Sequence, residues 1–256
     1  MKIGASTFYG IINKSVIESV NELEKAGFDI VELMYEYDNY FSDEEIDYLK
    51  KKNLDFSMHC PFVGMMPTHL NLDFADQHLR LFEKSMQVAV EIGCAQYVLH
   101  GCFFPMVYGK VEGKKSREFF IDLFIERFFA IFEKFQKAGL KILMENLGSE
   151  NEIGGKVEDI VRIQKSIPAV GFCFDIAHAV VSNEIDEIFG KLKIDYVHIT
   201  DNLLIKDDHM VVGEGKIDFK DIISRLKNTG FDGKIILENL SFEECVKSRD
   251  YLGKII

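Results

Sequence analysis

Nine side chains that can bind metal ions are spread along this chain, and most of them end a short apolar run that is typical of a buried β-strand. They are His59, His100, Glu145, Asp175, His178, His198, Asp207, His209 and Glu238. A charged side chain in such a place is costly to bury unless it is paired or coordinated. A mixed set of carboxylate oxygens and imidazole nitrogens suits divalent Mn, Mg, Co or Zn. The pattern therefore predicts a metal centre and, with it, a metalloenzyme.

The elements that must bring these side chains together are strands and helices that alternate along the chain, which is the pattern of βαβ units. Eight strands are expected, at Ile3–Ser6, Ile30–Met34, Phe56–His59, Tyr97–His100, Ile142–Glu145, Gly171–Asp175, Tyr196–Ile199 and Ile235–Glu238. Helices are expected after the strands, for example at Ser15–Ala26, Asp76–Ile92, Arg117–Lys137, Phe219–Lys227 and Phe242–Leu252. Parallel strands of a closed barrel direct their C-terminal ends to one face. We therefore predict an α/β fold, a single (β/α)8 TIM barrel over residues 1–256, with the metal centre at its C-terminal mouth.

The composition is that of an ordinary globular protein, with 47% hydrophobic and 28% charged residues. A formal net charge of −12 weighs against a nucleic-acid partner, because contacts to phosphates need Lys and Arg. The N-terminus lacks the pattern of a signal peptide, and no window is apolar enough to span a bilayer. Five cysteines without a Cys-x-x-Cys pair indicate reduced thiols. We therefore expect a cytoplasmic protein with no membrane partner, while the oligomeric state stays open.

Two further pairs of residues could bind a ligand, but they do not end a predicted strand as most of the nine side chains do. Lys110 and Lys114 belong to a basic cluster that follows the strand ending in His100, and we expect them to bind substrate, for instance by gripping a phosphate group. His69 and His78 end no strand. These two histidines are therefore expected to be structural.

Four segments make the chain similar to a known family: GFCFDIAHA, YVHITDN, DHMVVGEGKIDF and IILENL. With them the whole chain resembles the xylose isomerase-like TIM-barrel superfamily, which contains sugar isomerases, sugar epimerases and endonuclease IV (AP endonuclease family 2). The resemblance implies a divalent metal cofactor, Zn or Mn, with one to three ions per chain.

The likeness to the sugar epimerases implies one metal ion, held by Glu145, Asp175, His198 and Glu238. The two glutamates would lie on opposite sides of the substrate, so that one removes a proton from carbon while the other returns it. His178 would contact a substrate oxygen.

The likeness to endonuclease IV implies three zinc ions and a use for all nine side chains. The first ion would be held by His59, His100 and Glu145, the second by Glu145, Asp175, His198 and Glu238, and the third by His178, Asp207 and His209. Such a site would cleave a phosphodiester bond at an abasic position in DNA. The acidic loop at residues 35–45 would, however, repel a phosphate backbone.

We therefore predict a sugar or sugar-phosphate isomerase or epimerase with Glu145 and Glu238 as catalytic residues and a small-molecule substrate. The alternative is an endonuclease IV-like zinc phosphodiesterase, which alone would have nucleic acid as a partner. A metal-binding barrel without catalytic activity is the third class left open.

Overall fold

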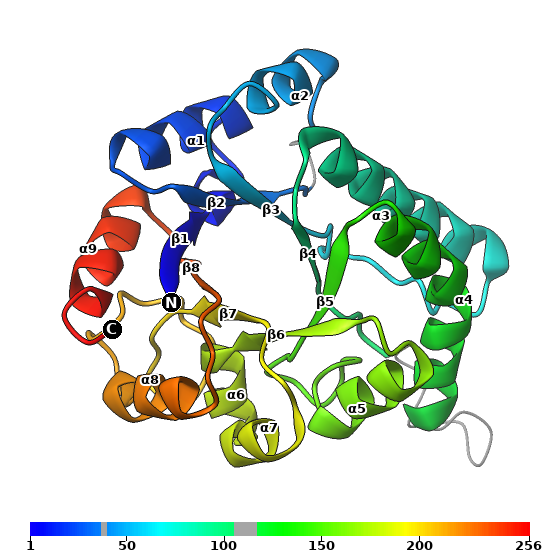
Figure 1. The fold of residues 1–256 in the computed structure, drawn as a ribbon. Helices are drawn as coiled ribbons and strands as arrows, with labels where there is room; N and C mark the ends of the chain where they lie inside the picture. The colour runs from blue at the N-terminus through cyan, green and yellow to red at the C-terminus, as the bar shows by residue number, and fades with distance from the viewer. Residues whose placement is uncertain (37–39, 105–116) are drawn as a thin grey trace.

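The computed structural model describes residues 1–36, 40–104 and 117–256, and its strands form a ring enclosed by helices (Figure 1). Within these residues eight parallel strands close into a barrel in sequence order, with β1 paired to β8. The strands are β1 Lys2–Ser6, β2 Ile30–Met34, β3 Asp55–His59, β4 Gln96–Leu99, β5 Lys141–Glu145, β6 Gly171–Asp175, β7 Tyr196–Ile199 and β8 Lys234–Leu237. The predicted barrel is confirmed. His100 and Glu238 lie one residue beyond the strands in which the sequence had placed them.

Helices connect the strands around the outside of the ring. They are η1 Thr7–Gly10, α1 Val16–Lys25, α2 Asp43–Leu49, α3 Leu72–Ile92, α4 Arg117–Lys137, α5 Val157–Ser166, α6 Ile176–Ser182, α7 Ile185–Lys191, α8 Phe219–Asn228 and α9 Phe242–Leu252. Helix α3 begins four residues before the predicted Asp76, because the Asn71 side chain accepts a hydrogen bond from the Phe74 N–H and caps an earlier turn. Two helices, α6 and α7, stand between β6 and β7 where one was expected.

The core has two parts because each strand has an inner and an outer face. Between the barrel and the helices lies a large apolar cluster, to which α4 contributes Phe120, Phe124, Phe128 and Phe132, all buried on one face of that helix. A separate cluster inside the barrel takes one residue from each of six strands. It consists of Ile30, Val98, Leu143, Cys173, Tyr196 and Ile236. The interior is therefore packed with side chains, and a site can open only at an end.

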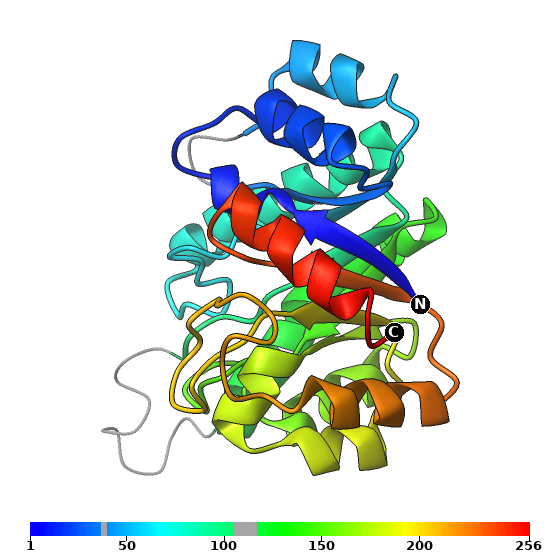
Figure 2. The same cartoon turned by 90° about the vertical axis from the view of Figure 1, so that its left-hand side faces the viewer.

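The loops that follow the strands gather at one end of the barrel, while both chain termini lie at the other end (Figure 2). This arrangement places the C-terminal ends of the strands, where the predicted site residues lie, at the loop-bearing mouth. Among the described residues no helix combines the length and the apolar character that crossing a membrane requires.

Candidate metal centre

Four of the nine predicted ligands meet at the mouth of the barrel. Glu145 ends β5, Asp175 ends β6, His198 lies on β7 and Glu238 follows β8. All four side chains are buried, and one ligand atom from each lies within 4.8 Å of the others. Three carboxylates and one imidazole are a donor set that suits Mn, Zn or Mg. The residues present therefore fit a divalent ion.

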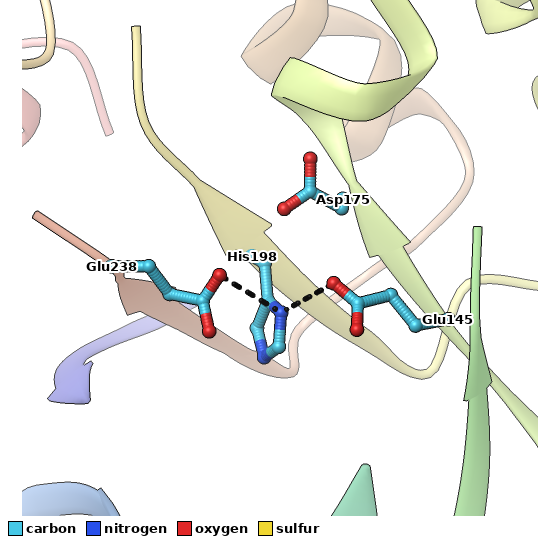
Figure 3. A group of neighbouring side chains, drawn as sticks. All are labelled: Glu145, Asp175, His198 and Glu238. Atoms are coloured by element: carbon cyan, nitrogen blue, oxygen red, sulfur yellow. Dashed lines mark hydrogen bonds and ion pairs between the residues drawn. The ribbon is translucent and has the colours of Figure 1, made fainter. Parts of the chain in front are cut away.

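His198 is the centre of this group, with a glutamate on either side of its ring (Figure 3). Its Nδ1 atom lies 3.0 Å from Glu145 Oε1 and 3.4 Å from Glu238 Oε2. Asp175 approaches from β6, whose register pairs it with His198. The Asp175 carboxylate is held in place because its Oδ1 atom accepts a 2.6 Å hydrogen bond from the His178 backbone N–H at the start of α6. A short strand pairing and a helix N-terminus thus fix two of the four donors.

His59 and His100 stand beside this group, at the ends of neighbouring strands. Each ring places its Nδ1 atom 2.8 Å from a backbone carbonyl, that of Cys60 for His59 and that of Gly101 for His100. A ring N–H that donates to a carbonyl leaves the other nitrogen as a lone-pair donor. His59 directs that second nitrogen, Nε2, toward Glu145 Oε2 at 3.4 Å. Both histidines are thus oriented as metal ligands or substrate contacts would be.

His178, Asp207 and His209 form a third group on the rim. Asp207 Oδ2 lies 2.8 Å from His209 Nε2 and 3.3 Å from His178 Nε2. The Asp207 Oδ1 atom is buried and has no hydrogen-bond partner among the described residues. A buried carboxylate oxygen without a donor is costly, so a bound cation or a hydroxyl group at this atom would be favourable.

A cavity of about 110 Å³ joins the three groups. Its walls include seven of the nine predicted side chains, namely His59, His100, Glu145, His178, Asp207, His209 and Glu238. Phe8, Met34 and Phe62 complete the lining with apolar surface. A small molecule in this cavity would therefore contact both polar donors and acceptors and apolar side chains.

The pKa values of the carboxylates diverge in this buried setting. Burial raises the pKa of Glu238 to about 7 and that of Asp175 to about 6. Burial also acts on Glu145, but His198 and His59 outweigh it and hold the pKa of that carboxyl well below its usual range. For His198 burial opposes the charged form, yet the surrounding carboxylates raise its pKa well above the ordinary value. The three carboxylates therefore stabilise positive charge placed between them, and a divalent ion would supply that charge.

His100 differs from the other histidines of the cavity. Its burial lowers its pKa to about 4, with Glu145 opposing that effect. His100 is therefore neutral at neutral pH, which is the state in which imidazole binds metal ions or accepts a hydrogen bond.

Glu32 belongs to the site but was not among the predicted residues. It lies within β2 and is fully buried, and its Oε1 atom is 3.1 Å from His198 Nε2. Tyr196 donates a 2.9 Å hydrogen bond to its other oxygen. The only signal in the sequence was a glutamate inside the apolar run IVELM, since it does not end the strand.

Asp201 fixes the loop that carries Asp207 and His209. Its buried carboxylate accepts hydrogen bonds from the backbone N–H groups of Gly213, Gly215 and Ile217, at 2.9, 2.8 and 3.2 Å. The added Cβ of an alanine at Gly215 would lie 2.2 Å from Asp201 Oδ1. Only glycine can therefore come this close to the carboxylate.

We expect Asp201→Ala to lower the free energy of unfolding by about 1–3 kcal/mol, because it leaves buried N–H groups without an acceptor. Urea denaturation measures this change. Glu214→Ala is the matched control from the same loop, since the Glu214 side chain is exposed and should contribute little. Equal stability of the two variants would contradict the proposed role of Asp201.

The remaining predicted residues have varied outcomes. Lys110 and Lys114 lie outside the described residues, so their predicted role stays a prediction. His78 accepts a 2.8 Å hydrogen bond from the Met66 N–H, and His69 Nδ1 accepts one from the Asn71 N–H, which agrees with structural roles for both. The five cysteines are buried free thiols.

Comparison with known proteins gives matches along the whole chain. The family model described as xylose isomerase-like TIM barrel matches residues 20–251. An uncharacterised protein of Methanocaldococcus jannaschii is 27% identical over 268 aligned residues, covering 100% of this chain and 89% of that protein. Among solved structures, a D-tagatose 3-epimerase-like protein is 26% identical with a TM-score of 0.89, covering 100% of this chain and 97% of the other.

A second solved structure, the IolI protein with a zinc atom, is 17% identical with a TM-score of 0.76. The match covers 100% of this chain and 98% of the IolI chain. At that identity the likeness concerns the fold alone. The family model, by contrast, spans nearly the full sequence and includes the strands that carry the four clustered donors. The chain therefore belongs to the xylose isomerase-like TIM barrel family.

Proposed function

We propose that this protein is a divalent-metal-dependent isomerase or epimerase that acts on a sugar or a sugar phosphate. The observation that carries the proposal is the placement of Glu145 and Glu238 on opposite sides of His198, with both side chains lining the same cavity. Two carboxylates facing one small-molecule cavity can exchange protons with the two faces of one carbon atom. The similarity to a D-tagatose 3-epimerase-like protein supports the same class of reaction.

Glu145, Asp175, His198 and Glu238 would hold the metal ion. When bound, the ion would polarise the oxygen atoms of the sugar and so make the neighbouring C–H bond more acidic. This assignment rests on the buried donor set of this chain.

The proton transfers are assigned to the two glutamates. One carboxylate accepts the proton from the carbon next to the sugar carbonyl, and the other donates a proton to the same carbon or its neighbour. Return to the opposite face of the same carbon gives an epimer. Return to the neighbouring carbon gives an isomer when the hydroxyl proton of the first carbon also passes to the former carbonyl oxygen. We assign His178, on the cavity wall, contact with a substrate oxygen, and Lys110 and Lys114 contact with a phosphate if the substrate carries one.

The apolar part of the wall has its own function in this scheme. Phe8, Met34 and Phe62 line the cavity, and the rings of Phe8 and Phe62 lie beside those of His209 and His59, with centroids 5.1 and 5.5 Å apart. Their surface would pack on the carbon-bound hydrogens of a sugar and limit the entry of water, which strengthens the electrostatic interactions inside.

The test is an exchange experiment in D2O with the metal-loaded protein and a panel of ketoses, aldoses and their phosphates. We expect deuterium to enter the product of at least one sugar class at a single carbon. Protein treated with chelator is the control and should give no exchange. Absence of exchange across the panel, with metal bound, would count against the proposal.

The endonuclease IV-like phosphodiesterase is the second candidate, because His59, His100, His178, Asp207 and His209 line the cavity next to the four clustered donors. Such a gathering is more than one metal ion needs. The acidic residues near the mouth weigh against this candidate, since Asp43 and Glu44 are exposed at the start of α2.

This candidate predicts salt-sensitive binding to duplex DNA with an abasic site and cleavage that is lost in His59→Ala and His209→Ala. Equal affinity for intact and abasic duplex would exclude it.

A further inference from the structure

A chain of hydrogen bonds crosses the interior of the barrel beneath the four clustered donors. The Ser57 and Tyr196 hydroxyl groups are 2.6 Å apart, and the Tyr196 hydroxyl donates to Glu32 Oε2 at 2.9 Å. The Glu32 carboxylate in turn faces His198 Nε2, with Oε1 at 3.1 Å and Oε2 at 3.3 Å. The chain thus runs from β3 through β7 and β2 and ends on the imidazole of the candidate metal centre.

The strand register explains why these residues meet. Glu32 on β2 pairs laterally with Ser57 on β3. Tyr196 and His198 are two residues apart on β7 and therefore point to the same side of that strand. Glu32 is consequently in reach of both of these side chains across the barrel interior.

Burial of Glu32 is costly without these partners. The side chain is fully buried, and its neighbours within β2 are apolar. A buried carboxylate needs donors, and the described contacts supply two, the Tyr196 hydroxyl and the His198 imidazole, both of which lie within hydrogen-bond distance of Oε2. The Oε1 atom has no hydrogen-bond partner among the described residues, although His198 Nε2 lies 3.1 Å from it. A leucine or valine at position 32 would pack in the interior without this cost. The position of this carboxylate against His198 Nε2 points to an effect on that imidazole.

The two nitrogens of His198 have different surroundings. Nδ1 faces Glu145 and Glu238, which are proposed to share a metal ion with it, whereas Nε2 faces Glu32. A nitrogen that binds a metal ion must present its lone pair, so the ring proton must be on the other nitrogen. The neutral tautomer with its proton on Nε2 leaves the Nδ1 lone pair free for a metal ion and lets Nε2–H donate a hydrogen bond to Glu32.

We propose that Glu32 is a positioning residue that holds the Nε2 proton of His198 and thereby directs the Nδ1 lone pair to the metal ion. This inference rests on the metal site of the proposed function, but it does not depend on which substrate is used. It assigns Glu32 an effect on metal affinity through His198, with no contact between Glu32 and the substrate.

The test is titration of the metal-free protein with Zn²⁺ alone, followed by calorimetry, in the wild type and in Glu32→Gln. We expect the affinity of Glu32→Gln to fall by about 10- to 100-fold, as is usual when the hydrogen-bond partner of a metal-binding histidine is changed. Ser57→Ala is the matched control, because it removes the far end of the chain and leaves the Glu32–His198 contact intact. Its affinity should stay near that of the wild type.

Nitrogen-15 spectra of the histidine rings in the zinc-loaded protein report the position of the His198 ring proton, which would not change if Glu32 only stabilised the fold. The wild type should show the proton of His198 on Nε2, in a hydrogen bond that protects it from exchange, and Glu32→Gln should show weaker protection. If Glu32→Gln does not fold, Glu32→Asp replaces it, since it keeps the charge but draws the carboxylate back from Nε2. The affinity of Glu32→Asp should then fall as well.

The outcomes separate the two proposals. A folded Glu32 variant that binds Zn²⁺ as tightly as the wild type overturns the role of Glu32 and leaves the proposed function intact. A wild-type protein that binds no Zn²⁺ overturns both the metal site and the role of Glu32. Weaker binding in the variant together with unchanged sugar specificity supports the role of Glu32.

Discussion

Replacing either glutamate by its amide, in Glu145→Gln or Glu238→Gln, is expected to reduce solvent-proton exchange into the sugar by about 100- to 10,000-fold, the usual contribution of general acid–base catalysis. An amide keeps the size of the side chain but can neither accept a proton from carbon nor return one. Both side chains line the cavity, so the loss should occur for either variant. The measurement is the rate of deuterium incorporation at saturating sugar.

Loss of the metal ion could mimic this result, because both glutamates also belong to the clustered donor set. The metal content of each variant should therefore be measured, and rates compared at saturating metal. Glu184→Gln is the matched control, since this partly buried glutamate caps α5 by accepting a 2.7 Å hydrogen bond from the Val157 N–H and lies outside the cavity lining. Wild-type exchange in both Glu145→Gln and Glu238→Gln would rule out the assigned proton transfers.

Removal of the metal ion is expected to abolish turnover and to lower the thermal stability of the protein. Three buried carboxylates meet in the donor set, and a divalent ion offsets their mutual repulsion. A ligand present at 100 times its Kd stabilises the folded state by about 2.7 kcal/mol, which corresponds to about 5–10 °C in Tm for a protein of this size. Melting curves with chelator, and then with Zn²⁺ or Mn²⁺ restored, measure the shift.

His198→Ala is the control for the metal-removal experiment. It removes the single imidazole of the clustered donors, so its Tm should no longer depend on added metal. A Tm of the wild-type protein that is insensitive to chelator and to millimolar metal would contradict the proposed site.

The barrel and most of the cavity were predictable from the sequence because of where the polar residues lie. Glu145 and Asp175 each end an apolar strand, and parallel strands bring such ends to one face. Rules for strand ends therefore sufficed to gather residues that are far apart in the chain. His100 and Glu238 fall one position past their strands, which changes the element but not the face at which they lie.

Glu32 could not be predicted in the same way, because its role depends on contacts across the barrel. Its partners Tyr196 and His198 are 164 and 166 positions away in sequence. A glutamate within an apolar strand is a weak signal by itself, since it does not indicate which side chain it meets. Asp201 was missed for a related reason, because its partners are backbone N–H groups of a loop, which the sequence does not reveal.

The first residue of α3 could not be predicted from the sequence pattern either. The apolar periodicity predicts a helix from Asp76, whereas Asn71 begins it at Leu72 through one side-chain hydrogen bond. A cap of this type adds about a turn without changing the apolar face, so the periodic pattern alone does not locate it.

The claim that Glu145, Asp175, His198 and Glu238 hold a divalent ion is tested most directly by elemental analysis of the protein purified without chelator, beside His198→Ala. The wild type should contain about one divalent ion per chain, Zn or Mn, and the variant should contain little. About three zinc ions per chain would favour the phosphodiesterase over the isomerase. Absence of any bound divalent ion in the wild type, even after incubation with Zn²⁺ and Mn²⁺, would contradict the account.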